Sequence, residues 1–491
     1  MGPRFGTAEV VFLITLAATF WVSFLARRHA RQAGDDALAG RKANRWLIGL
    51  SAGATANSGF IVTAGVGLGY AYGMQWMMLP LSWLLGDLVF WRFFPARINA
   101  FGHATHATTL SELITSGLHG KLANAISILC AVVILVCLAG YTSAQWLARQ
   151  KFLSGAFQLP DYAALGLFAL IIVAYSAIGG FRGSLYADTL QAVIRIVGTI
   201  IAIVAVVIAA MANPEVFAKN IEAAGSNFLN PFPTGALAGV GFVVGFAAAA
   251  MGFGLGQPQI ITRYLAGSSP EETQAAKWIY ISFVQGTWIA MTAFGMILRG
   301  VTPGLTDPEA GFGVFFQANV HAVITGIIAA DVFATIAATS NSILIAMAQA
   351  VKHDLLLRIY PHRGHGTTLA PIVLVVGAIT MIVSLIIEGT VLSLALSSVS
   401  LMGAGLAPAV IVKVLNLRHS SSSLAFGICV GLFSALAWKY TGLATYINEA
   451  GIGMACGLVA NWLLGFRSGV DKQGRNSDKA VVSDNQGGRN E

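Results

Sequence analysis

The chain carries little charge for its length. Asp, Glu, Lys and Arg make up 10% of its 491 residues, whereas hydrophobic residues make up 56%, and the mean hydropathy is +0.73. A soluble protein carries roughly 25% charged residues, so this chain lacks the polar surface that a water-soluble globule of this size requires. The 55 glycines point the same way, because small residues let membrane helices approach closely. The composition therefore predicts an all-α integral membrane protein.

Signatures of catalysis and metal binding are also missing. The four cysteines lie in apolar segments and form no C-x-x-C pair, so we interpret them as packing residues. No paired carboxylates with a neighbouring nucleophile, no histidine pair at metal-ligand spacing and no phosphate-binding loop occur in the sequence. These absences argue against an enzyme. We therefore expect no cofactor.

The chain has many apolar segments of about 20 residues, the length needed to cross a bilayer. We predict thirteen transmembrane helices at residues 8–26, 46–72, 74–98, 122–147, 159–178, 184–211, 235–256, 276–300, 321–352, 368–387, 389–415, 423–440 and 445–466. The first is too long for a signal peptide and has no evident cleavage site, so we interpret it as a retained helix. The polar segment 467–491 is predicted to be a disordered cytoplasmic tail.

The basic residues predict an orientation in the membrane. The net charge of +8 does not indicate nucleic-acid binding, because these residues lie in short loops between apolar segments. With the N-terminus outside, about 22 Lys and Arg fall on the cytoplasmic side and about 6 on the other, as the positive-inside rule requires. We therefore predict an outside N-terminus and a cytoplasmic C-terminus. Short loops and few cysteines favour a bacterial cytoplasmic (inner) membrane.

Two of the predicted spans are interrupted by glycine-rich segments. The second span contains Gly53-Ala-Thr-Ala-Asn-Ser-Gly59, and the seventh contains Gly252-Phe-Gly-Leu-Gly-Gln-Pro258. Irregular backbone at membrane depth survives only where protein or water satisfies its polar groups, and secondary transporters use such breaks to bind ions and substrates. Either segment alone could reflect ordinary glycine packing. Their matching positions favour a binding site.

The matched breaks divide the chain into two repeats of five helices. The first repeat covers residues 46–211 and the second covers 212–415, and each begins with a broken helix. One extra helix and a basic cytoplasmic loop (1–45) precede the repeats, and two helices (416–466) follow them. In transporters built from inverted repeats, substrate and ion sites lie near the middle of the membrane.

The resemblance of this chain to a known family rests on four parts of the sequence. They are Tyr175-Ser-Ala-Ile-Gly-Gly-Phe-Arg-Gly-Ser-Leu-Tyr-Ala-Asp-Thr-Leu-Gln191, Gly254-Leu-Gly-Gln-Pro-Gln-Ile-Ile-Thr-Arg-Tyr264, Phe94-Pro-Ala-Arg97 with Leu110-Ser-Glu-Leu113, and Gly403-Ala-Gly-Leu-Ala-Pro408. These segments resemble the sodium/solute symporter family, and its proline and pantothenate branch most closely. The resemblance covers the chain to about residue 415. It implies the leucine-transporter type of inverted-repeat fold.

The resemblance implies a sodium site between the first break and the ninth span. The ligands it implies are Ala54, Asn57, Thr335, Ala338, Thr339 and Ser340. Sodium prefers oxygen ligands, yet Ala338 stands where the family carries a hydroxyl, and Ser340 replaces it only if the register shifts by one. Ala56 likewise stands where proline-type members carry an aspartate. The hydroxyls of Thr339 and Ser340 could instead bond carbonyls one turn earlier and serve only helix packing.

Four ionisable residues within or beside the spans are interpreted as an ion path or gate. They are Asp188, Asp87, Asp331 and Arg263. The resemblance places an ion-release carboxylate at Asp188, which could instead stabilise a helix N-terminus. We interpret Asp87 as pairing with Arg92 or Arg195, with a proton relay as the alternative. Asp331 either lines the outer ion path or faces extracellular water, and Arg263 is interpreted as a gate or anchor.

A solute held between the two breaks would meet neutral polar groups and space created by glycine. The predicted binding residues are Asn57, Ser58, Gly59, Tyr141, Gln145, Phe253, Gly254 and Gln257. A proline-type pocket carries aromatic residues just before its Gly-Gln-Pro. This chain has Ala250 and Gly254 there, so proline itself is disfavoured, although Phe60, Phe246 and Phe253 could compensate.

The predicted function is cation-coupled uptake, with sodium as the cation, of a small polar or zwitterionic solute such as an amino acid or organic acid. The expected partners are this small-molecule solute, the coupling cation and the lipid bilayer, and no nucleic acid. The alternative is a transporter-like solute sensor, or a proton-coupled or uncoupled carrier with a degenerate sodium site.

Overall fold

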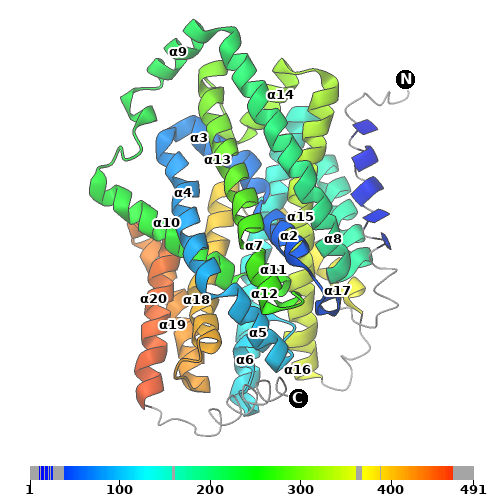
Figure 1. Cartoon of the computed structure of the whole chain (residues 1–491), viewed down its shortest axis with the longest axis vertical. Coiled ribbons are helices and arrows are strands. Elements are labelled where there is room, and N and C mark those ends of the chain that lie inside the picture. Colours follow the sequence, from blue (N-terminus) through cyan, green and yellow to red (C-terminus); the bar gives the residue numbers. More distant parts are fainter. Residues whose placement is uncertain are drawn as a thin grey trace.

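The computed structural model is a bundle of long helices (Figure 1). It describes residues 38–157, 161–360, 368–387 and 389–467, together with parts of 10–25. Within these ranges the β-pairing is a single bridge between Ala43 and Gly267, and the prediction of an all-α membrane protein is confirmed. Part of the first predicted span, and the predicted tail beyond residue 467, lie outside the described residues.

The helices follow the predicted spans closely. In chain order the principal ones are α2 (Arg45–Ala56), η2 (Ile61–Gly65), α3 (Val66–Tyr72), α4 (Met74–Phe93), α5 (Pro95–Thr105), α6 (Leu110–Thr115), α7 (Gly120–Phe157), α8 (Asp161–Ala212), α9 (Pro214–Ala223), α10 (Ala236–Gly256), α11 (Pro258–Leu265), α12 (Pro270–Ala275), α13 (Lys277–Val301), α14 (Gly311–Asn319), α15 (Ala322–Gln349), η5 (Ala350–Leu356), α17 (Leu369–Ile386), α18 (Val391–Val414), α19 (Ser421–Tyr440) and α20 (Glu449–Arg467).

The number of membrane crossings is only partly defined by length and composition. Among the described residues, eight helices are long and apolar enough to cross a membrane, and two bent helix pairs each have the composition of one more span. The count of thirteen therefore stays a prediction, as do the repeat and domain boundaries.

One of these eight helices is long enough for two crossings. The apolar part of α8 runs for 44 residues from Ala169 to Ala212, which as straight helix would extend about 66 Å, whereas the hydrocarbon core is about 30 Å thick. Gly180 interrupts it with φ 58° and ψ −162°, a conformation that glycine adopts without steric cost. The predicted spans 159–178 and 184–211 lie on either side of this interruption.

The two predicted breaks are present. The α2 helix ends at Ala56, and the chain resumes as η2 and α3 at an angle of 63° to it. The α10 helix ends at Gly256, and α11 begins at Pro258. Proline fits at the first position of a helix because its missing N–H has no helical partner there anyway. The chain therefore has a helix break on each side of the site described below.

Helices α15 and α18 form the centre of the bundle, since they are the most enclosed of the candidate spans. The α15 helix packs against α2, α7, α8 and α17, and α18 packs against α7, α10, α19 and α20. The α17 helix lies at the periphery and exposes Leu374, Val375, Ile379, Ile382 and Leu385. An apolar face of this kind suits contact with lipid, because the bilayer interior offers no polar partner.

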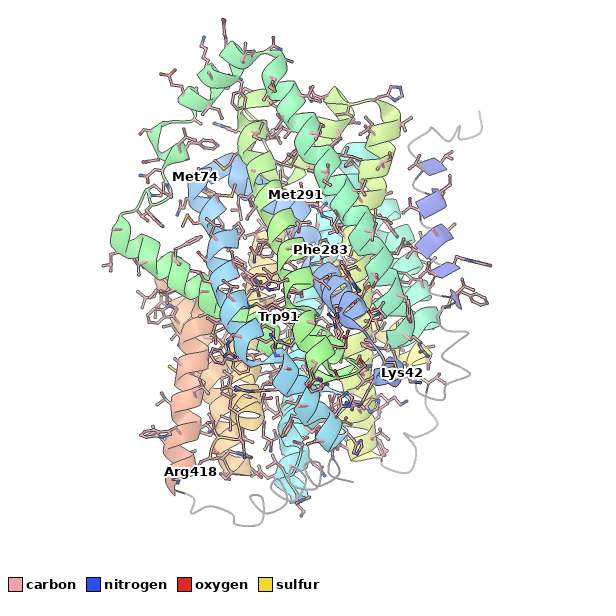
Figure 2. The ribbon with its side chains drawn as sticks, in the orientation of Figure 1. Lys42, Met74, Trp91, Phe283, Met291 and Arg418 are labelled. Atoms are coloured by element: carbon pink, nitrogen blue, oxygen red, sulfur yellow. The ribbon has the colours of Figure 1, made fainter. Side chains whose placement is uncertain are left out.

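The two ends of the bundle differ. Figure 1 places α9 and α14 at one end and α5, α6 and α16 (Leu357–Ile359) at the other. Figure 2 shows the labelled Arg418 at the end with α5 and α6, Lys42 in the same half of the bundle, and Met74 toward the opposite end. The end with α5 and α6 is the cytoplasmic one in the predicted orientation. That orientation stays a prediction. The bridge between Ala43 and Gly267 and the ion pair between Arg45 and Glu272 tie the two chain halves together there.

Close backbone contact between α3 and α13 depends on glycine. A methyl group on Gly295 would lie 2.0 Å from the carbonyl oxygen of Val66, whereas one on Gly286, in the same helix, would meet nothing within 4 Å. We expect Gly295→Ala to destabilise the protein by about 1–3 kcal/mol, because the two helices must separate. Gly286→Ala is the matched control, and its helix propensity gains up to about 1 kcal/mol.

Thermal unfolding of the purified protein in detergent measures both variants. Equal melting temperatures for Gly295→Ala and Gly286→Ala would contradict the close packing of α3 on α13.

Candidate solute and cation site

The first helix break is held by side chains from other helices. Asn57 ends α2, and the next free amide, that of Gly59, donates a hydrogen bond to Oε1 of Gln145 on α7 at 2.8 Å. The amide of Phe60 donates to Oγ of Ser58 at 3.2 Å. Buried backbone amides need partners, and here a glutamine and a serine supply them. A methyl group on Gly59 would lie 2.8 Å from Cβ of Ala148, so glycine is required for this approach.

The second break is held by close backbone packing. A methyl group on Gly256 would lie 2.8 Å from both Cα of Gly403 and the carbonyl oxygen of Met402 on α18. Oε1 of Gln257, at the break itself, accepts a hydrogen bond from Nε2 of Gln259 at 2.7 Å. The glycine-rich segment around Gly403 therefore supports the second break.

A small cavity lies between the two breaks. It is lined by Ala56, Ser58, Phe60, Leu79, Trp83, Tyr141, Phe253, Val284, Trp288, Ala395, Leu396 and Val399. The room it leaves for water-sized molecules is about 30 Å³, enough for one or two waters. None of these lining residues is charged, and five are aromatic. We call it the aromatic cavity.

The aromatic rings of this cavity contact one another. The ring centroids of Trp83 and Trp288 are 5.1 Å apart, those of Trp83 and Phe253 are 5.7 Å apart, and those of Phe60 and Trp288 are 5.8 Å apart. These distances fall within the range of favourable aromatic pairs. The rings come from four different helical segments, α4, α10, α13 and the segment after the first break, so the wall exists only in the folded chain.

Three of the predicted solute residues meet at the aromatic cavity, namely Ser58, Tyr141 and Phe253. The other five lie elsewhere. Gln145 and Gly59 bind each other, Asn57 lines a second cavity, Gly254 lies against the ring of Phe90, and Gln257 binds Gln259. Solute binding by any of these residues stays a prediction.

The sequence reasoning missed the two tryptophans. Trp83 and Trp288 lie on α4 and α13, outside the segments that carry the family resemblance. The sequence also predicted a site lined by neutral polar groups, with space left by glycine residues, whereas the wall of the cavity is largely aromatic. No local motif marks these residues, because only the packing of α4 and α13 turns their rings toward the break. Phe246 does not line the cavity and packs against Trp76 and Phe242.

A second cavity contains four of the six predicted sodium ligands. It is lined by Ala54, Asn57, Gln191, Arg195, Phe283, Ala334, Thr335 and Ala338, and it leaves no room for a water molecule. We call it the break cavity. In Figure 2 the labelled Phe283 lies beside α2 in the middle of the bundle. A methyl group on Gly53 of α2 would lie 2.5 Å from its ring.

The other two predicted sodium ligands lie close by on α15. Oγ1 of Thr339 donates a hydrogen bond to the carbonyl oxygen of Thr55 at 3.0 Å, so α15 does meet the end of α2. Oγ of Ser340 is buried without a hydrogen-bond partner among the described residues. The amide oxygen of Asn57 accepts from Oγ1 of Thr287 at 2.8 Å. Sodium binding by these residues stays a prediction.

Asp331 is buried and forms an ion pair. Its Oδ2 lies 2.6 Å from Nη1 of Arg195, and the two side chains are 0% and 1% exposed. The interpretation that Asp331 faces extracellular water is therefore wrong, because α8 covers it. Its role in an outer ion path stays a prediction.

The expected partner of Asp87 is also corrected. Arg195 is bound to Asp331, and Arg92 is exposed and lies against the ring of Phe93, so neither arginine pairs with Asp87. The Asp87 carboxylate instead accepts a hydrogen bond from Nε2 of Gln285 at 3.2 Å. Its assignment to an ion path stays a prediction.

Asp188 and Arg263 form a second buried ion pair. Nη2 of Arg263 lies 2.8 Å from Oδ2 of Asp188, and both side chains are at most 1% exposed. Ser51 of α2, Ser184 of α8 and Ser342 of α15 donate hydrogen bonds to the same carboxylate oxygen at 2.9, 3.2 and 3.3 Å. We call these five residues the inner cluster. It joins four helices between the break and the α5–α6 end of the bundle.

The alternative that Asp188 stabilises a helix N-terminus is wrong. The residue lies two turns beyond Gly180, where the second part of α8 begins, so its carboxylate is not at a helix N-terminus. The macrodipole acts within the first turn. Its partner is the arginine that the sequence reasoning interpreted as a gate or anchor.

These features define the class of the protein, a multi-pass α-helical membrane transporter with two broken helices that meet near a central cavity. The chain matches the sequence model of the sodium:solute symporter family over residues 37–431. It therefore belongs to the sodium:solute symporter family. Its function class is cation-coupled solute transport, and it is not an enzyme.

Curated relatives of known activity match most of the chain. The osmoregulated proline transporter of Bacillus subtilis (strain 168) is 25% identical over 451 residues, which cover 88% of each chain. The sodium/proline symporter of Escherichia coli (strain K12) is 25% identical over 449 residues, again 88% of each chain.

Solved structures of other transporters share the fold. A Na+-coupled sialic acid symporter in a substrate-bound, outward-open state superposes with a TM-score of 0.79 at 17% identity, covering 95% of this chain and 99% of the other. A nucleobase-cation-symport-1 family transporter in a closed conformation gives a TM-score of 0.53 at 13% identity, with 90% and 98% coverage. At these identities the likeness concerns the fold alone.

The inner cluster leads to a prediction about stability. We expect Asp188→Asn and Arg263→Gln each to cost about 3–5 kcal/mol, because each leaves the other charge buried without a partner. The double variant should cost less than the sum, since it removes both charges. Arg92→Gln, at an exposed arginine, is the control and should be near neutral.

Thermal unfolding of the four variants forms a double-mutant cycle with its control. Strictly additive losses from the two single variants would show that the two residues do not interact in the protein.

Proposed function

We propose that this protein takes up proline, or an α-amino acid of similar size with an apolar side chain, by cation-coupled alternating access across a bacterial cytoplasmic membrane. The observation that carries the proposal is the aromatic cavity between the two breaks, whose lining residues carry no charge. Ligand sites are typically lined by apolar and aromatic side chains with a few polar groups that fix orientation.

The aromatic cavity leaves about 30 Å³ in this state, so its walls must move apart before an amino acid can enter. The helix break beside it suits the two ends of a zwitterionic amino acid. The amides of Gly59 and Phe60 lie at the start of the helical segment after the break, and a helix N-terminus attracts a carboxylate. In the present state Gln145 and Ser58 oxygens hold these amides, at positions that a substrate carboxylate could take. The carbonyl end of α2, on the other side of the break, suits an ammonium group.

The aromatic wall suits an apolar ring. Trp83, Trp288 and Phe253 present their rings to one cavity, and hydrophobic burial stabilises a small hydrocarbon ring there. This supports proline, which the sequence reasoning disfavoured because it sought the aromatic residues just before Gly-Gln-Pro. The curated relatives named above are described as proline transporters, which supports the same solute. They are transporters, so the sensor alternative is not favoured.

The cavity also predicts which solutes are rejected. A solute with a net charge would be buried without a charged partner, which costs several kcal/mol. Glutamate and lysine should therefore compete poorly with proline.

Alternating access would require the inner cluster to open. It ties α2 and α11 to α8 and α15 on the side of the predicted cytoplasm. Release of solute to that side would have to separate these helices. The charge-assisted hydrogen bonds of the inner cluster favour the inward-closed state.

The test is uptake of radiolabelled L-proline into liposomes that contain the purified protein. We expect accumulation above equilibrium when an inward cation gradient is imposed, whereas mere equilibration would indicate uniport. Trp288→Leu should raise the KM for proline about tenfold or more, because it removes an aromatic wall worth on the order of 1.4 kcal/mol. Trp278→Leu is the matched control.

Trp278 suits this purpose because it lies on the same helix but is 62% exposed and distant from the cavity. Equal KM values for the two tryptophan variants, or no binding of proline under any gradient, would sink the proposal.

A further inference from the structure

Arg195 lines the cavity in which the family resemblance implies sodium. The other residues that line this break cavity include the predicted ligands Ala54, Asn57, Thr335 and Ala338. Its side chain is 1% exposed, so its charge lies in the protein interior and is not a surface charge. The chain thus places a permanent cation beside the end of α2, because arginine does not lose its proton in proteins.

The charge of Arg195 is balanced by a residue of the helix that should supply sodium ligands. Asp331 lies on α15, one turn before Thr335, and its Oδ2 is 2.6 Å from Nη1 of Arg195. A sodium ion entering the break cavity would meet this guanidinium at short range. In a medium of low dielectric constant the repulsion between two such cations is strong.

The packing of α8 makes room for this pair. A methyl group on Gly198, which follows Arg195 by one turn, would lie 2.3 Å from Cγ of Asp331. Any side chain larger than hydrogen at Gly198 would thus displace the carboxylate from the guanidinium. The ion pair therefore depends on Gly198 as well as on Arg195 and Asp331.

One predicted oxygen ligand is missing and another is already bound. Ala338 has no side-chain oxygen, and the amide oxygen of Asn57 accepts from Thr287. Among the described residues, the unpartnered side-chain oxygens nearby include Oε1 of Gln191, which lines the cavity, and Oγ of Ser340. A hard cation such as sodium requires several oxygen ligands, and the guanidinium of Arg195 together with the missing hydroxyl at Ala338 makes this cavity a poor fit for it.

We propose that Arg195, paired with Asp331, is a resident cation that takes the place of sodium at the break, so that no sodium ion binds in this cavity. The pair joins α8 to α15 beside the end of α2 without a transported ion. The inference concerns the coupling cation of the proposed function, and it does not depend on which solute is transported. The coupling cation is then a proton, or an ion bound away from the break cavity.

The first test uses the unmodified full chain in detergent. Its melting temperature is compared in NaCl, KCl and choline chloride at equal ionic strength, and binding of radioactive sodium is measured alongside. We expect no sodium-specific stabilisation that depends on Thr339. Sodium stabilisation that is lost in Thr339→Ala would overturn the proposal, because it would place sodium in the break cavity of the wild type.

Sodium stabilisation that persists in Thr339→Ala would place the ion elsewhere and would support the proposal. This comparison needs no change at Arg195, so it decides the matter even if the arginine variants fail to fold.

The second test replaces the resident cation. In Arg195→Ala the carboxylate of Asp331 loses its partner, and a small cation can neutralise it. We expect this variant to be less stable than wild type in KCl and choline chloride, and to be restored by NaCl or by millimolar guanidinium. Its affinity for sodium should be at least about tenfold higher than that of wild type, equivalent to about 1.4 kcal/mol.

The controls separate charge from packing. Arg195→Ala combined with Asp331→Asn should show no recovery with either cation, because the carboxylate charge is gone. Arg92→Ala, at an exposed arginine, should match wild type throughout. Recovery of the double variant to the same extent as Arg195→Ala would contradict the proposal. Proline uptake is scored separately, so its absence would sink the proposed function and leave the sodium result standing.

Discussion

The structure depends on one constraint: a polar or charged group inside the membrane must find its partner within the protein, because the hydrocarbon supplies none. Both helix breaks obey it. At the first break, Gln145 of α7 accepts a hydrogen bond from the backbone amide of Gly59, which has no helical partner. At the second, the backbones of α10 and α18 approach so closely that Gly256 and Gly403 admit no side chain.

The same constraint explains the two buried ion pairs. Arg263 and Asp188 lie within a set of serine hydroxyls contributed by three helices, whereas Arg195 binds Asp331 beside the break cavity. Such pairs are weak evidence for stability, because desolvation offsets much of the attraction. Their value lies in fixing which helices lie side by side, and the two pairs hold α8 against α11 and α15 on the two sides of the break.

The lining of the aromatic cavity contains no charged residue. Its walls come from helices far apart in the sequence, and its polar character comes from backbone at the ends of a broken helix. A zwitterion suits such a site, because partial charges of opposite sign face each other across the break. The break cavity next to it is lined by the guanidinium of Arg195, a fixed charge that the family resemblance did not imply.

Much of the fold followed from the sequence alone. Apolar segments of membrane-spanning length predicted the helices, and the glycine-rich segments at residues 53–59 and 252–258 predicted both breaks, because apolar runs and glycine-rich segments are local features of the sequence. Tertiary structure decided which side chains meet. No spacing in the sequence indicates that Arg195 binds Asp331 across 136 positions, or that Trp83 and Trp288 face one cavity. Such contacts depend on how the helices are rotated and packed in the bundle, and short-range sequence patterns carry no information about that.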